Sequence, residues 1–164
     1  MSMRNTFLTI GKLLYEDKEL LRLLHYPPEN KGKGIKNPLD PLLKDIEQFD
    51  YDWKIRDELI VTKYKDDDLV EKAICRINVY PGQRISTGHN YTLASQDLIV
   101  DVFCHSNFDK DLRLLGISDR LNDILIGNRI AGVTKFKYER GGRLEAPNGY
   151  TGYRHFYSFE ASKK

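Results

Sequence analysis

Hydrophobic residues near the start of the chain recur at intervals of three and four positions, the spacing of one face of an α-helix. The positions on this face are Phe7, Ile10, Leu13, Leu14, Leu20, Leu21, Leu23 and Leu24. The pattern predicts one or two amphipathic helices over residues 4–24. Pro27 and Pro28 end it, because a proline disfavours helical geometry in the residue before it.

Residues 27–41 show no periodic pattern and contain four prolines and two glycines. Irregular stretches of this length are uncommon inside a domain, and they are generally functional arms, contact segments or disordered. We therefore expect 27–41 to be an extended segment within a helical N-terminal region, residues 1–57.

The pattern changes to a period of two after residue 58. The apolar positions that share a face are Cys75, Ile77 and Val79, then Leu98, Val100, Val102 and Cys104. This alternation predicts two half-buried strands that pair with each other. Residues 109–126 return to helical spacing, and 130–139 and 150–160 alternate again, which predicts a helix followed by a long hairpin.

The predicted order is helix, strand pair, helix, strand pair. It indicates an α+β fold with a mostly antiparallel sheet of four to five strands, and with the N-terminal helix or helices and one central helix packed on one face. The 164 residues suit a single domain, 1–164, with the sheet and helix core in 58–164.

Composition and charge exclude several classes of protein. No apolar run approaches the roughly 18 residues that a membrane span needs, and no secretory signal is readable, so we expect a protein that acts inside a cell without a membrane partner. The net charge is +2, but residues 128–164 carry eight basic and three acidic side chains, a net of +5. Residues 58–127 have a net charge of −3. Such polarity favours contact with a partner of opposite sign or with nucleic acid.

No motif for catalysis or cofactor binding stands out. Neither glycine-rich nucleotide motif is present, and Cys75 and Cys104 lack the spacing of a zinc site, so both are expected to be small buried residues. The histidines lie in four separate segments, where only tertiary structure could assemble a triad: His25, His89, His105 and His155. We therefore expect no enzyme, no cofactor and no metal site.

Two chemical alternatives stay open. Asp97 and Asp101 could contribute to a magnesium-dependent nuclease, which needs convergent carboxylates. The simpler interpretation is that Asp97 is solvated and that Asp101 faces solvent or pairs with a basic neighbour on the outer face of the sheet. Arg140 and Arg143 at the predicted hairpin tip, beside several tyrosines, could contact nucleic acid, although alternating aromatics are also typical of a half-buried strand.

Three long polar segments, 27–41, 80–94 and 139–149, are each too long for a tight turn. Segments of this kind become ordered against neighbouring copies in closed symmetric assemblies, so the sequence favours an interaction protein over a catalyst.

The stretch from Leu98 to Phe159 resembles the C-terminal part of tail-terminator and tail-completion proteins, which occupy the neck of tailed bacteriophages. The resembling features are the strand 98–105, the helix 111–127 and the closing hairpin that ends at 152–159. The resemblance is one of arrangement, and it covers about 60 residues. The N-terminal half is less similar, which leaves a head-closure or connector ring open as an alternative.

The resemblance implies a structural, non-enzymatic virion protein that forms a homo-oligomeric ring, a hexamer in that family. Its implied partners are the tail tube protein and a head-completion or connector protein, with DNA passing through the lumen without sequence-specific binding. It would be located in the neck of the virion, and in the host cytoplasm during assembly. By position, the loop 82–90 and the tip 140–148 would contact neighbouring copies or rings, and the expected interface residues are Gly82, Arg84, His89, Arg140, Arg143 and Asn148.

Overall fold

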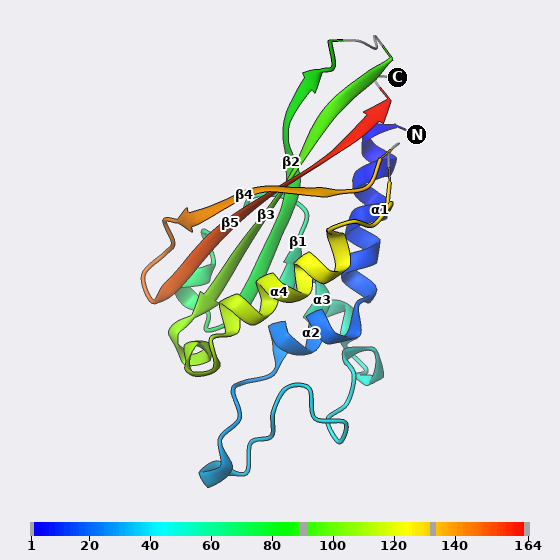
Figure 1. The fold of residues 1–164 in the computed structure, drawn as a ribbon. Helices are drawn as coiled ribbons and strands as arrows, with labels where there is room; N and C mark the ends of the chain where they lie inside the picture. Colours follow the sequence, from blue (N-terminus) through cyan, green and yellow to red (C-terminus); the bar gives the residue numbers. More distant parts are fainter. Residues whose placement is uncertain (1, 89–91, 132–133, 163–164) are drawn as a thin grey trace.

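A five-stranded sheet in the order β1-β2-β3-β5-β4 forms the centre of the molecule (Figure 1). The computed structural model describes residues 2–88, 92–131 and 134–162. Among the strands of these described ranges, only β1 runs parallel to its neighbour, and the other pairs are antiparallel. The strands are β1 (Ile60–Val61), β2 (Cys75–Ser86), β3 (Leu93–His105), β4 (Lys137–Leu144) and β5 (Tyr150–Ser162). The predicted α+β class and the mostly antiparallel sheet are confirmed.

The α-helices gather on one face of the sheet. They are α1 (Met3–Glu16), α2 (Lys18–His25), α3 (Asp52–Leu59) and α4 (Arg113–Leu125). Asp17 separates α1 from α2, where its carboxylate caps the second helix by accepting from the Leu20 amide at 2.8 Å. Apolar residues of all four helices share one buried cluster with β2, β3 and β5. The predicted helix pattern therefore identified the face that forms the core.

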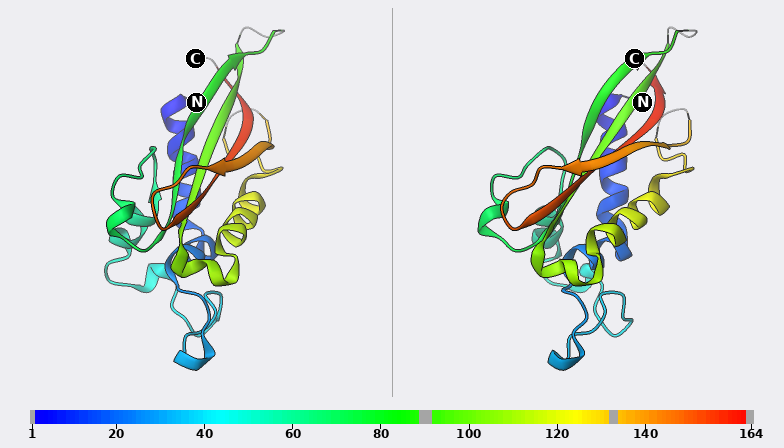
Figure 2. Two further views of the ribbon diagram at one scale, coloured as in Figure 1. Left: turned by 90° about the vertical axis from the view of Figure 1, so that its left-hand side faces the viewer. Right: turned by 60° about the vertical axis from the view of Figure 1, so that its left-hand side comes forward.

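The segment between α2 and α3 projects from the end of the molecule opposite the two chain termini (Figure 2). Its base is held by Arg22, whose Nε lies 2.7 Å from Asp45 Oδ1. The same guanidinium donates to the carbonyls of Asp40 at 2.8 Å and Leu43 at 2.6 Å. Residues 27–41 lie within this projecting segment, which is anchored at its base.

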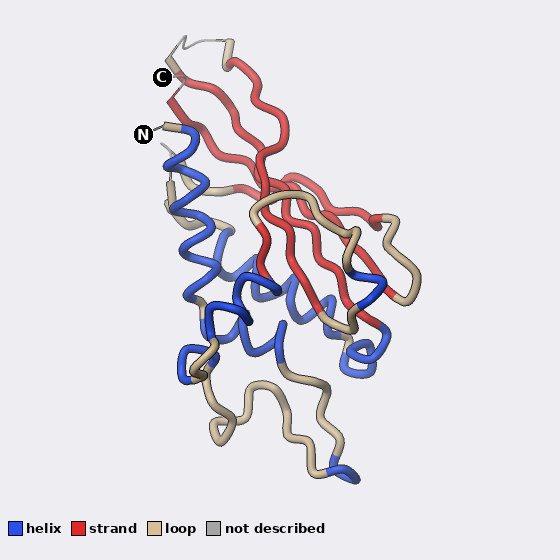
Figure 3. The backbone as a smooth tube through the Cα atoms, turned by 180° about the vertical axis from the view of Figure 1, so that it is seen from behind, coloured by secondary structure: helices blue, strands red, loops and turns tan. Residues whose placement is uncertain are grey.

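The chain after β1 crosses to the other face of the sheet (Figure 3). Arg76, only 2% exposed, donates to both carboxylate oxygens of Asp68 at 2.6 and 3.0 Å. Asn78 donates to the Lys65 carbonyl at 3.1 Å. These contacts hold residues 62–72 against the outer face, so polar residues of β2 that alternate with its apolar ones become buried.

Two predicted loops are strands instead. Gly82 and Arg84 lie in β2, and Arg140 and Arg143 lie in β4, rather than in a loop and at a hairpin tip. The sequence predicted this strand of the hairpin over 130–139, whereas β4 spans Lys137–Leu144, because an edge strand exposed along almost its whole length carries no alternation of burial that would fix its bounds. The hairpin turn begins after Leu144, and Asn148 lies within it.

Candidate interaction surface

The expected interface residues do not come together in space. β2, which carries Gly82 and Arg84, is separated from β4, which carries Arg140 and Arg143, by both β3 and β5. His89 lies outside the described residues. The residues expected in one contact loop and one contact tip therefore lie on two strands at opposite sides of the sheet.

Packing within the subunit accounts for Gly82 and Arg84. Gly82 lies where the β2–β3 register shifts, and a Cβ there would be 2.9 Å from Ile99 Cδ1. Arg84 donates to Gln96 Oε1 at 3.4 Å and to the carbonyl of Ser162. Both residues therefore make contacts within their own subunit, Gly82 by close packing and Arg84 by hydrogen bonds.

The exposed strand β4 presents its cations in different ways. The Arg140 guanidinium lies 4.2 Å from the ring centroid of Phe156, a cation–π contact on the face opposite the helices. Arg143 lines a shallow depression with Glu145 and Tyr150. Within the described residues, β4 pairs only with β5, so its second edge is unpaired. An unpaired edge offers backbone donors and acceptors to another chain.

A second edge is open along the upper half of β2. β1 pairs only with Ile77 and Asn78, whereas β2 continues to Ser86. In the described part of the chain, the stretch of β2 beyond Asn78 has a strand neighbour on one side only. The sheet thus has an unpaired edge on each side, one along β4 and one along this part of β2.

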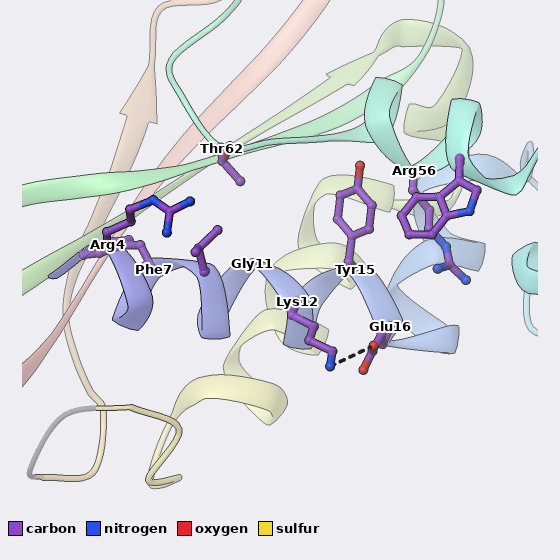
Figure 4. Close-up of a pocket in the computed structure, with 10 residues that line it drawn as sticks. Arg4, Phe7, Gly11, Lys12, Tyr15, Glu16, Arg56 and Thr62 are labelled. Carbon is purple, nitrogen blue, oxygen red and sulfur yellow. Dashed lines mark ion pairs between the residues drawn. The ribbon is translucent and has the colours of Figure 1, made fainter. Parts of the chain in front are cut away.

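An apolar groove of about 540 Å³ runs between α1 and α3 (Figure 4). Phe7, Leu8 and Tyr15 of α1 form one wall, and Trp53 of α3 forms the other. Leu8 is 54% exposed and Trp53 is 65% exposed, although both are large and apolar. Exposed apolar surface of this kind marks an interaction site.

The rim of this groove is mainly cationic. Arg4, Lys12 and Arg56 line it together with the acid Glu16, and Asp57 accepts from the hydroxyl of the lining residue Tyr15. Lys12 lies 3.9 Å from Glu16, and Arg56 lies 3.6 Å from Asp52, so both pairs are loose. The buried Nε of Arg56 has no hydrogen-bond partner among the described residues. This groove was not predicted from the sequence, although Leu8 and Trp53 lie outside the buried helical stripe and could have indicated it.

Tertiary structure does bring a histidine beside a serine. His155 Nε2 lies 2.8 Å from Ser118 Oγ, and His155 Nδ1 lies 3.0 Å from the Tyr138 hydroxyl. Ser118 donates its own proton to the Leu114 carbonyl at 2.8 Å. The tautomer that satisfies every group has Tyr138 donating to Nδ1 and Nε2–H donating to Ser118.

This arrangement does not activate the serine. A general base must accept the nucleophile's proton, whereas here the imidazole donates to the hydroxyl. Burial lowers the pKa of His155 to about 4, with a smaller opposing effect from Asp101, so the ring is neutral near pH 7. The pair therefore connects α4 to the sheet as a buried polar link.

The two candidate carboxylates lie in different environments. Asp101 is fully buried, with its oxygens 2.7 Å from Arg154 Nε and 2.6 Å from the Tyr80 hydroxyl. The expected basic partner is present, but Asp101 is not solvated. Burial raises the pKa of Asp97, which makes no ion pair among the described residues. In the described ranges, no group of three or more acidic, histidine or cysteine side chains is arranged to hold a metal ion.

Comparison with known proteins gives two findings. The sequence profile of the YomW family matches residues 17–159. The chain is also 31% identical over 166 aligned residues to the SPbeta prophage-derived uncharacterized protein YomW of Bacillus subtilis (strain 168), covering 94% of each chain. The chain belongs to the YomW family.

The YomW match extends from α2 into β5 and includes the whole of β1, β2, β3 and β4. The prophage-derived relative indicates a protein of phage origin. The matched range holds the α3 wall of the groove and both open sheet edges, whereas the α1 wall precedes it. None of the helices in the described residues is long and apolar enough to span a membrane.

Proposed function

We propose that this protein is a structural subunit of a phage neck, of the tail-terminator kind, which forms a ring between the tail tube and the head connector. The observation that carries the proposal is the order of elements from β3 to β5. A strand, the helix α4 and a closing hairpin follow one another there, the arrangement on which the resemblance rests. The prophage-derived relative supports the same class of protein.

The proposed role is structural and not enzymatic. The reactive-looking groups are already engaged: Ser118 and His155 satisfy each other, and Asp101 is paired with Arg154. By contrast, two sheet edges and an apolar groove remain available for protein contacts. We place the protein in the virion neck, and in the host cytoplasm during assembly.

The partners proposed are further copies of the chain, the tail tube protein and a head-completion or connector protein. DNA would pass through the lumen without sequence-specific contacts. The basic C-terminal region then faces a protein neighbour, because an acidic or neutral lining lets DNA slide more freely. Arg154 and Arg140, which are held by Asp101 and Phe156, are in keeping with that orientation.

Deletion of the gene from a phage that encodes this protein tests the proposal. We expect filled heads and separate tails in electron micrographs, and we expect gold-labelled antibody to mark the neck of complete particles. A terminator stops tube growth, so its loss gives overlength tails. Tails of normal length that fail to join would instead indicate the head-closure ring. Normal, infectious particles would overturn the neck assignment.

A further inference from the structure

The groove between α1 and α3 combines apolar surface with positive charge. Leu8 and Trp53 are each more than half exposed, and Arg4 makes no ion pair among the described residues. A complementary occupant carries an apolar side chain flanked by carboxylates.

The same chain displays such a feature on its other face. In the short 3-10 helix η3 (Leu69–Glu71), Val70 is 64% exposed. The Asp67 side chain is 80% exposed, and Glu71 is exposed as well. We call residues 66–71 the acidic knob.

The acidic knob is fixed in place and cannot turn back into the groove of its own subunit. Leu69 is fully buried, and Asp68 is bound by Arg76 at 2.6 Å. Thr62 lines the groove, but the chain then crosses to the outer face, where Asn78 holds the Lys65 carbonyl. Knob and groove are therefore two different, complementary surfaces of one rigid subunit.

We propose that the α1–α3 groove binds the acidic knob of a second copy, with Val70 against Leu8 and Trp53, and with Asp67 and Glu71 facing the cationic rim. This inference rests on the proposed function, because it assumes that the subunits assemble with one another. Contact between two different surfaces is head-to-tail, and such contacts generate rings when the rotation closes.

Trp53 reports directly on this contact, because it is the single tryptophan of the chain and lines the groove. Raising the concentration of purified full-length protein should shift its emission to shorter wavelength. Sedimentation velocity should show larger species over the same concentration range.

Two variants separate the partners of the contact. Leu8→Asp spoils the groove and Val70→Asp spoils the acidic knob, and each should weaken self-association roughly 30-fold, as expected for a central interface residue. Leu115→Asp is the matched control, because Leu115 on α4 is also 54% exposed but lies outside the groove. Circular dichroism checks that all three variants fold.

Mixing the two variants gives the sharpest test. Leu8→Asp still offers an intact acidic knob and Val70→Asp an intact groove, so the mixture should form a 1:1 dimer that cannot grow. A groove-to-groove contact would instead leave Val70→Asp able to pair with itself and would give no heterodimer in the mixture.

Three results would overturn the inference: a wild-type monomer at every concentration, an inert mixture, or equal loss of association in Leu115→Asp. Assembly of phage particles distinguishes failure of this inference from failure of the proposed function. If Leu8→Asp supports normal joining while gene deletion does not, the groove contact is wrong and the neck role stands.

Discussion

His155 is a basic side chain kept neutral by its surroundings. Its ring is 4% exposed and lies between the hydroxyls of Ser118 and Tyr138. Burial is the main cause of its pKa of about 4, against 6.5 for an ordinary histidine. Between these values the unfolded chain binds more protons than the folded one, so protonation favours unfolding.

The free energy of unfolding should therefore fall as the pH is lowered from about 6.5 to 4, and this part should be absent in His155→Gln. The difference between the two profiles should reach about 3 kcal/mol, from the size of the pKa shift. Urea unfolding of both proteins across this range measures it. Parallel profiles would show that His155 does not titrate as described.

Gly141 and Gly142 make a matched pair for the packing around this ring. A Cβ on Gly141 would lie 2.1 Å from the Tyr138 hydroxyl and 2.7 Å from Tyr153 Cε1, whereas Gly142 has open space. Gly141→Ala should cost about 1–3 kcal/mol, because Tyr138 must leave His155. Gly142→Ala should be nearly neutral. Thermal unfolding compares them, and equal stabilities would contradict the packing.

Asp101 gives a third test at this scale. Asp101→Ala removes one partner of a buried ion pair and should lower the free energy of unfolding by about 3 kcal/mol, while Asp97→Ala should change it little. Chemical denaturation measures both. If cleavage of DNA with Mg²⁺ were found and lost in Asp101→Ala without loss of stability, the nuclease alternative would return.

At the scale of elements, the projecting segment depends on one side chain. Arg22 is bound to Asp45 and to the carbonyls of Asp40 and Leu43, and its side chain is 12% exposed. Arg22→Ala should raise amide hydrogen exchange across residues 37–48 and cost about 1–3 kcal/mol. Arg4→Ala, which removes no ion pair in the described residues, is the control. Unchanged exchange in Arg22→Ala would show that the segment is held by other contacts.

Elements with one buried face were predictable from the sequence, and elements without one were not. The stripe of α4 and the alternation of Leu98 to Cys104 mark faces that contact the core. β4 has no buried face, and its Gly141–Gly142 pair is typical of a turn, so the part of it from Arg140 onward was predicted as a loop tip. In fact Gly141 allows Tyr138 and Tyr153 to approach each other.

At the scale of the whole molecule, the sequence predicted the layers but not the surfaces. The groove forms from α1 and α3, which are about forty residues apart, and the acidic knob is held in place by the bond of Asp68 to Arg76 of β2 and by the burial of Leu69. No local pattern reports contacts between such distant positions. The phage origin, which the resemblance implied, is indicated by the prophage-derived relative.

The unpaired edge of β4 bears on whether the free protein aggregates. A long unpaired edge can form backbone hydrogen bonds with strands of other molecules, which leads to aggregation. This strand carries four exposed charged side chains, which are Lys137, Glu139, Arg140 and Arg143. Charged side chains along an open edge disfavour such pairing between copies of the free protein.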